Sequence, residues 1–183
     1  MRRSENGFSL VEILVSAFVL AFGVIGAIGM QLTALRTTQQ SSLHTNALHL
    51  AADMADRMRA NLVRMREADA DNPYLQVDFQ SGGAIAHTGF DCYADDVDCD
   101  PVQLAQFDIA EWLTQLDRRL PNVRVRICRD AHSGMDDGFD WSCEAAEESA
   151  PAVIKIGWRN KDQAPTENDG APRLNLLVAS FPA

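Results

Sequence analysis

The N-terminal part of the chain lacks two kinds of residue that would interrupt a membrane-spanning helix. No proline occurs before Pro73, and no charged residue lies between Glu12 and Arg36. Proline breaks helices, so its absence permits one long helix here. The uncharged stretch is apolar and, as a helix, is long enough to cross a bilayer. The sequence therefore predicts a single membrane-spanning helix near the N-terminus.

The sequence also lacks the common motifs of catalysis and metal binding. It contains no P-loop, no G-x-G-x-x-G, no G-x-S-x-G and no H-E-x-x-H motif. No two cysteines are spaced C-x-x-C, and the histidines show no ligand spacing, which argues against zinc. These histidines are His44, His49, His87 and His132. We therefore predict no enzymatic activity, no cofactor and no metal site.

Negative charge is concentrated in the second part of the chain. The formal net charge is −10, with seven basic and five acidic residues up to Glu67 and nine and twenty-one from Ala68 onward. Such an acidic domain argues against nucleic-acid binding. Two acidic clusters leave calcium binding open as an alternative to solvated loops, although neither has the EF-hand pattern. The clusters are Asp95, Asp96, Asp98 and Asp100, and Asp136, Asp137 and Asp140.

A short basic leader with Arg2 and Arg3 meets the apolar run at Gly7. A secretory signal would instead place a small-residue cleavage site after its apolar core, and none follows here. A carboxylate inside an apolar run is costly in lipid and marks a functional position by default, which draws attention to Glu12. A plain membrane anchor or an uncleaved signal is the alternative interpretation.

The segment Gly7-Phe8-Ser9-Leu10-Val11-Glu12 resembles the class III signal of type IV pilins and pseudopilins. The resemblance implies that a prepilin peptidase cuts between Gly7 and Phe8 and methylates the new amine of Phe8. It also implies that Glu12 pairs with the N-terminal amine of a neighbouring subunit. Physically, a carboxylate and an ammonium that are each costly in hydrocarbon become tolerable as a neutral pair.

Beyond the apolar run, the pattern predicts that the helix continues to about Glu67. Apolar residues recur there at spacings of three and four. They are Ala47, Ala51, Met54, Met58, Leu62 and Met65. The arginines at its end are interpreted as a solvated face, or alternatively as a contact with an acidic neighbour in a complex. They are Arg57, Arg59, Arg64 and Arg66. Within the apolar half, Gly23, Gly26 and Gly29 indicate close helix packing or a weak segment.

All four cysteines lie in the part that Arg2 and Arg3 place outside the inner membrane. An even number in an oxidising compartment predicts two disulfides. Three pairings are possible, and we favour Cys92 with Cys99 and Cys128 with Cys143 because each closes a local loop.

The pattern of residues after position 67 predicts an antiparallel sheet and a second helix. Residues 68–100 look irregular, with at most a short strand or helix. Asp100, Pro101 and Gln103 form a good helix start, and the helix should end at Leu120 before Pro121. Alternating residues then predict strands at 123–129, 152–158 and 174–178. Their apolar face should pack on Met54, Met58 and Leu62, and the first strand's arginines should face solvent or acidic loops.

The second helix carries another resemblance. Cys99-Asp100-Pro101, Leu104-Ala105 and the residues that follow resemble the minor pilin subfamily PilV. Those residues are Asp108, Trp112, Leu116, Leu120 and Pro121. This resemblance implies a low-abundance structural subunit that helps prime pilus assembly. Its partners would be other minor pilins, the major pilin, prepilin peptidase and the inner-membrane assembly platform.

These observations together predict an α+β, type IV pilin-like fold. A leader (1–7) would precede a transmembrane half (8–35) and an amphipathic half (36–67) of one helix, followed by a globular periplasmic domain (68–183). The protein would sit in the bacterial inner membrane with a cytoplasmic N-terminus, and later in the pilus. A minor pseudopilin of a type II secretion system and a membrane-tethered binding module are the alternatives.

Overall fold

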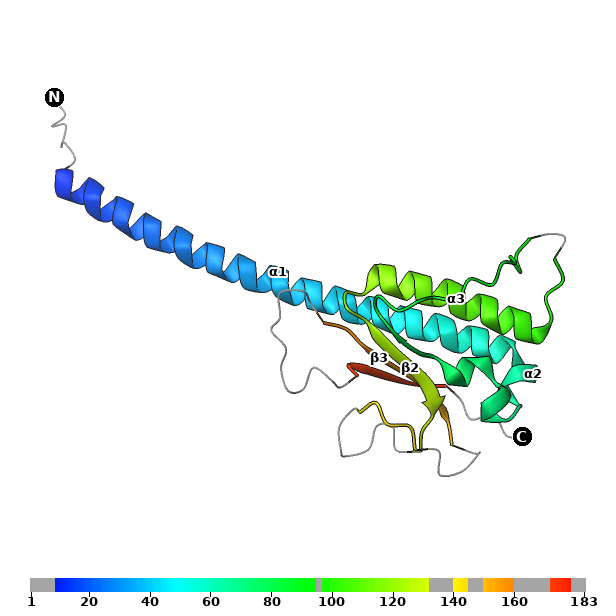
Figure 1. The fold of residues 1–183 in the computed structure, drawn as a ribbon. Coiled ribbons are helices and arrows are strands. Elements are labelled where there is room, and N and C mark those ends of the chain that lie inside the picture. Colours follow the sequence, from blue (N-terminus) through cyan, green and yellow to red (C-terminus); the bar gives the residue numbers. More distant parts are fainter. Residues whose placement is uncertain (1–8, 95–96, 132–139, 145–149, 160–171, 179–183) are drawn as a thin grey trace. The chain divides into compact units, whose positions relative to one another are not determined.

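A computed structural model describes residues 9–94, 97–131, 140–144, 150–159 and 172–178. The chain divides into two compact units, Met1–Ser42 and Leu43–Ala183. One helix, α1 (Leu10–Ala60), contributes residues to both units (Figure 1).

The first unit consists, in its described part, of the N-terminal portion of α1. Every side chain from Leu10 to Ser42 is exposed, including the large apolar ones, so this portion buries nothing within the chain itself. Its most apolar window has a mean hydropathy of 2.5 and is long and apolar enough to cross a membrane. An apolar helix that is exposed all round requires lipid or other helices around it.

The end of the long helix differs from the prediction. Helix α1 ends at Ala60, and a separate short helix, α2, spans Leu62–Met65. Asn61 between them has φ −100° and ψ 60°, and its side-chain amide donates to the carbonyl oxygen of Pro101 at 2.8 Å. Asparagine competes for hydrogen bonds outside the helix, so the prediction of one helix to Glu67 was wrong at this residue.

The second unit contains one antiparallel sheet in the order β1-β2-β3-β4. The strands are β1 (Asp78–Gln80), β2 (Arg124–Arg129), β3 (Ala152–Gly157) and β4 (Leu174–Val178). Strands β2, β3 and β4 fall where alternation predicted them. The register pairs Val125 with Ile156 and Ile154 with Leu176, so the apolar side chains of adjacent strands share one face.

The apolar face of the sheet packs on α1 and on the second helix, α3 (Pro101–Arg119). Met54 and Met58 of α1 are fully buried in this core, as predicted, whereas Leu62 is 46 % exposed. Met65, from the same predicted apolar series, is fully buried.

Helix α3 begins as its sequence predicted. The Asp100 carboxylate accepts from the main-chain N–H groups of Val102 and Gln103, at 2.8 and 2.9 Å. The Gln103 side chain accepts from the Asp100 N–H at 3.0 Å, which completes the capping box. The α+β fold with a long N-terminal helix, a small antiparallel sheet and an additional helix is thus confirmed.

The segment after α2 is more ordered than its sequence indicated. It contains two 3₁₀ turns, η1 (Asp69–Asp71) and η2 (Pro73–Gln76), before β1. Asn72 caps η2 by accepting from the N–H of Tyr74 at 3.1 Å. The capped turn places Tyr74 and Leu75 in the core and leads directly into the sheet.

Candidate assembly site and polar clusters

Glu12 lies in the first turn of α1, at the start of the apolar portion. Its N–H donates to the carbonyl oxygen of Ser9 at 3.0 Å, and its own carbonyl oxygen accepts from the Ser16 hydroxyl at 2.7 Å. The side chain is exposed among exposed apolar neighbours such as Val11 and Ile13. A carboxylate at a helix N-terminus is favoured by the helix dipole.

Gly7 and Phe8, the predicted cleavage and methylation residues, lie outside the described residues. Helix α1 begins two residues after Phe8, at Leu10. The separation of Glu12 from the predicted new N-terminus is therefore only about one helical turn in sequence. The structure does not join Glu12 to another charged side chain within the described part of the chain.

No other described part of the chain packs against Gly23, Gly26 or Gly29. A Cβ atom added at any of them would meet nothing within 4 Å. Their small size therefore serves no packing inside this single chain, and both interpretations given for them stay predictions.

Arg57, near the end of α1, forms ion pairs within the chain instead of facing solvent. The Arg57 guanidinium lies 3.0 Å from Asp108 and 2.7 Å from Glu111 of α3, and 3.2 Å from Asp53. Burial alone would lower the pKa of Arg57, but the hydrogen bond to Glu111 and the attraction of Asp53 and Glu111 raise it above its ordinary value. The solvated-face interpretation was wrong for Arg57, which joins α1 to α3.

Asp108 is the buried centre of this cluster. Its second carboxylate oxygen accepts from the hydroxyl of the fully buried Tyr74 at 2.7 Å. Burial, and then this hydrogen bond, raise the pKa of Tyr74 above its ordinary value. One carboxylate therefore ties together α1, α3 and η2. The sequence could have indicated that Asp108 is buried, because it lies four residues before Trp112 and therefore on the same face of α3.

Trp112 forms a second link between the helices. It is fully buried, and its indole N–H donates to the carbonyl oxygen of Leu50 in α1 at 2.8 Å. The buried face of α3 is formed by Ala105, Asp108, Trp112, Leu113 and Leu116.

Both disulfides occur, with the pairing that loop length favoured. Cys92 pairs with Cys99 at a Cα–Cα distance of 5.7 Å, and Cys128 pairs with Cys143 at 6.1 Å. The first loop carries Tyr93, whose ring packs edge-on against Phe107 of α3 at 5.0 Å. The disulfide therefore closes this loop, and the ring of Tyr93 packs the loop against α3.

The outer face of the sheet holds a buried lysine. Lys155 is 1 % exposed, and its ammonium lies 2.6 Å from Asp130 and 3.5 Å from Asp140. It also donates to the carbonyl oxygens of Asp140 and Ser142, next to Cys143. The hydrogen bond from Ser142 is the main cause that lowers the pKa of Asp140. Lys155 thus anchors the 140–143 segment over the sheet.

The arginines of β2 differ from one another. Arg124 and Arg126 are partly exposed and lie near Asp78, as predicted for solvent-facing residues. Arg129 is 5 % exposed and pairs with Asp69 at 2.7 Å. It also donates to the carbonyl oxygen of Ala150 at 3.1 Å. Arg129 therefore holds η1 against the end of the sheet.

No metal site is formed by the described residues, in which no three His, Cys, Asp or Glu side chains converge. Among the acidic clusters, Asp100 caps α3, and Asp140 contacts Ser142 and Lys155. Asp95, Asp96, Asp136 and Asp137 lie outside the described residues, as does His132. Asp100 and Asp140 therefore serve local structure.

Comparison with known families agrees with the N-terminal motif and the fold. Residues 2–28 match the family model for the prokaryotic N-terminal methylation motif. Residues 29–110 match the Tt1218-like model, described as type IV pilin Tt1218. No curated protein and no solved structure matched the chain. Over residues 2–110 the chain is thus similar to type IV pilins, and the exposed helix in this region is long and apolar enough to cross a membrane.

Proposed function

We propose that this pilin-type chain is a minor type IV pilin of the PilV kind, which helps prime pilus assembly and enters the pilus at low level. The observation that carries the proposal is Glu12, an exposed carboxylate at the start of an exposed apolar helix, beside a matched methylation motif. Its role is structural. Catalysis belongs to the peptidase that processes the chain.

The proposed processing uses three residues. Prepilin peptidase cuts between Gly7 and Phe8 and methylates the Phe8 amine. Glu12 of one subunit then pairs with the N-terminal ammonium of a neighbour as both leave the bilayer. In a medium of effective dielectric constant 20, such a pair at 4 Å is worth about 4 kcal/mol before desolvation. Pairing therefore favours insertion beside other helices of the same kind.

The proposed location follows from charge and cysteine chemistry. Arg2 and Arg3 favour a cytoplasmic N-terminus, which places the acidic domain and its two disulfides in the periplasm. The partners are the major pilin, other minor pilins and the inner-membrane assembly platform. A minor pseudopilin of a type II secretion system shares the same N-terminal motif and is the second candidate.

The test is a deletion strain complemented with the wild type, Glu12→Gln or Glu5→Gln. Glu5→Gln makes the same chemical change within the proposed leader and is the matched control. We expect Glu12→Gln to remain inserted in the membrane and to lower surface piliation and subunit incorporation at least about tenfold, because the ion pair is lost. Glu5→Gln should behave as wild type.

The readouts separate the candidates. Electron microscopy counts surface pili, secreted proteins are measured in the medium, and mass spectrometry identifies the mature N-terminus. Lost pili with intact secretion support the minor pilin. Intact pili with lost secretion support the pseudopilin. A Glu12→Gln protein that is incorporated normally would disprove the pairing role, and no change in either process would favour a tethered binding module.

A further inference from the structure

Strand β1 is followed by a tight turn that does not lead into a second hairpin strand. The N–H of Gly83 donates to the carbonyl oxygen of Gln80 at 2.8 Å, and Gly82 has φ +86°. A Cβ at Gly83 would lie 2.9 Å from that oxygen, so the turn requires glycine. Residues 84–88 return past β1 without forming a strand.

At the outer edge of β1 the main-chain groups of Asp78 are unpaired among the described residues, whereas the carbonyl oxygen of Gln80 is taken up by the turn. Val77 accepts from the Ile127 N–H at 2.9 Å, and the Ser81 N–H donates to the carbonyl oxygen of Val123 at 2.8 Å. Main-chain groups alternate in direction along an antiparallel strand, so those of Asp78 face away from β2. Within the described part of the chain, residues 84–87 make no main-chain hydrogen bond to another backbone.

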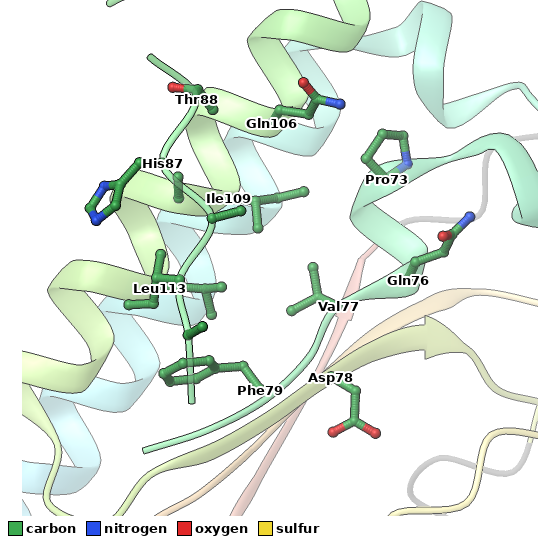
Figure 2. A pocket seen from close by; sticks show the side chains of 14 residues that line it. Pro73, Gln76, Val77, Asp78, Phe79, His87, Thr88, Gln106, Ile109 and Leu113 are labelled. Atoms are coloured by element: carbon green, nitrogen blue, oxygen red, sulfur yellow. The ribbon is translucent and has the colours of Figure 1, made fainter. Parts of the chain in front are cut away.

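A cavity of about 500 Å³ opens between these two unpaired segments and α3 (Figure 2). Figure 2 shows Val77, Phe79, Ile109 and Leu113 around the space, whereas the ring of His87 points away from it. Val77, Phe79 and Leu113 are each less than a tenth exposed. We call this cavity the β1 groove. It has an apolar floor and unpaired backbone on two sides.

The lining indicates what kind of ligand fits. Asp78 is the only carboxylate among the described residues that line the groove, and it lies near Arg124 and Arg126 of the neighbouring strand. These two guanidinium groups partly offset its charge. The specific feature that remains is the unpaired backbone, and exposed sheet edges accept extended peptides.

We propose that the β1 groove binds an extended segment of a partner protein by strand addition, with apolar side chains at alternate positions. The guest backbone pairs with Asp78 on one side and with residues 84–87 on the other. An apolar guest side chain enters the floor formed by Val77, Ile109 and Leu113. The surface is distinct from Glu12, so its loss and the loss of the assembly role are separately measurable.

The experiment uses the full chain in detergent micelles and a phage-displayed library of eight-residue peptides as the probe. Enriched peptides are synthesised and titrated by calorimetry, each beside a copy that is N-methylated on the backbone at alternate residues. N-methylation removes strand hydrogen bonds and keeps every side chain. We expect enriched peptides to alternate apolar and polar residues, and N-methylation to weaken binding at least about tenfold.

Two variants locate the binding. Gln106→Trp places a large ring on the exposed rim of the groove, and Arg118→Trp makes a similar change on the same helix away from it. The first should weaken binding about tenfold or more and the second should not. Amide exchange at Asp78 should slow when peptide binds. No enrichment, equal binding of the N-methylated peptide, or equal effects of the two variants would overturn the proposal.

Discussion

Replacing Asp108 with leucine should destabilise the domain severely, because this carboxylate has two partners in a dry site. Its side chain is 6 % exposed and accepts from Arg57 at 3.0 Å and from Tyr74 at 2.7 Å. A hydrogen bond to a charged group contributes about 1.5–3 kcal/mol. Arg57 keeps Asp53 and Glu111, whereas the hydroxyl of Tyr74 is left buried without its acceptor. We expect a loss of about 3–5 kcal/mol in the free energy of unfolding.

The same reasoning predicts that Tyr74→Phe destabilises the wild type but stabilises the Asp108→Leu variant. In the wild type, Tyr74→Phe removes a hydrogen bond to a charged acceptor and should cost about 1.5–3 kcal/mol. In the Asp108→Leu background, it removes a stranded buried hydroxyl and should recover about 1–3 kcal/mol. The pair forms a double-mutant cycle whose coupling energy reports the interaction.

The assay is denaturant unfolding of the full chain in detergent micelles, followed by tryptophan fluorescence, since Trp112 is buried between the helices. Asp117→Leu is the control, because Asp117 is an exposed carboxylate on the same helix and should change stability by less than about 0.5 kcal/mol. If Tyr74→Phe destabilised both backgrounds equally, the buried hydrogen bond would not contribute as argued.

Two more predictions follow from the same interface. The raised pKa of Tyr74 stabilises the fold below the ordinary tyrosine pKa, and this contribution is lost as pH rises from about 10 toward the folded value, by about 1.4 kcal/mol per pH unit. The difference in unfolding free energy between wild type and Tyr74→Phe should therefore shrink above about pH 10, and a constant difference would contradict it. Trp112→Phe should cost about 2–4 kcal/mol in the same unfolding assay, because it leaves a smaller ring and removes the hydrogen bond to Leu50; a cost under about 1 kcal/mol would argue against that contact.

The sequence was sufficient where local chemistry decides the structure. The Asp100 capping box located the start of α3, and alternation located β2, β3 and β4. Strand β1 has three residues, too few to show a period. The end of α1 was missed because Asn61 donates a hydrogen bond to the carbonyl oxygen of Pro101, a residue 40 positions away.

The polar clusters were harder to predict for a related reason. Lys155 alternates with apolar residues, as an outward-facing strand lysine does, and only the 140–143 segment folded over it makes it buried. Arg57 looked like one of several exposed arginines, and its partners lie on α3. In each case the deciding contact joins residues far apart in the chain. The N-terminal motif, by contrast, is a run of adjacent residues, so it could be recognised from the sequence alone.

Lys155 should affect the rate at which the Cys128–Cys143 disulfide re-forms after reduction. The Lys155 ammonium donates hydrogen bonds to the carbonyl oxygens of Asp140 and Ser142, and Ser142 directly precedes Cys143. These hydrogen bonds do not depend on the disulfide. If the disulfide is reduced, these contacts still hold the two thiols at a high effective concentration. Re-formation of the bond needs a disulfide oxidant such as oxidised glutathione: one thiolate displaces a glutathione thiol to form a mixed disulfide, and the second thiolate then displaces the other glutathione thiol within the same molecule. After reduction, a Lys155→Met chain should therefore re-form the Cys128–Cys143 bond more slowly in oxidised glutathione.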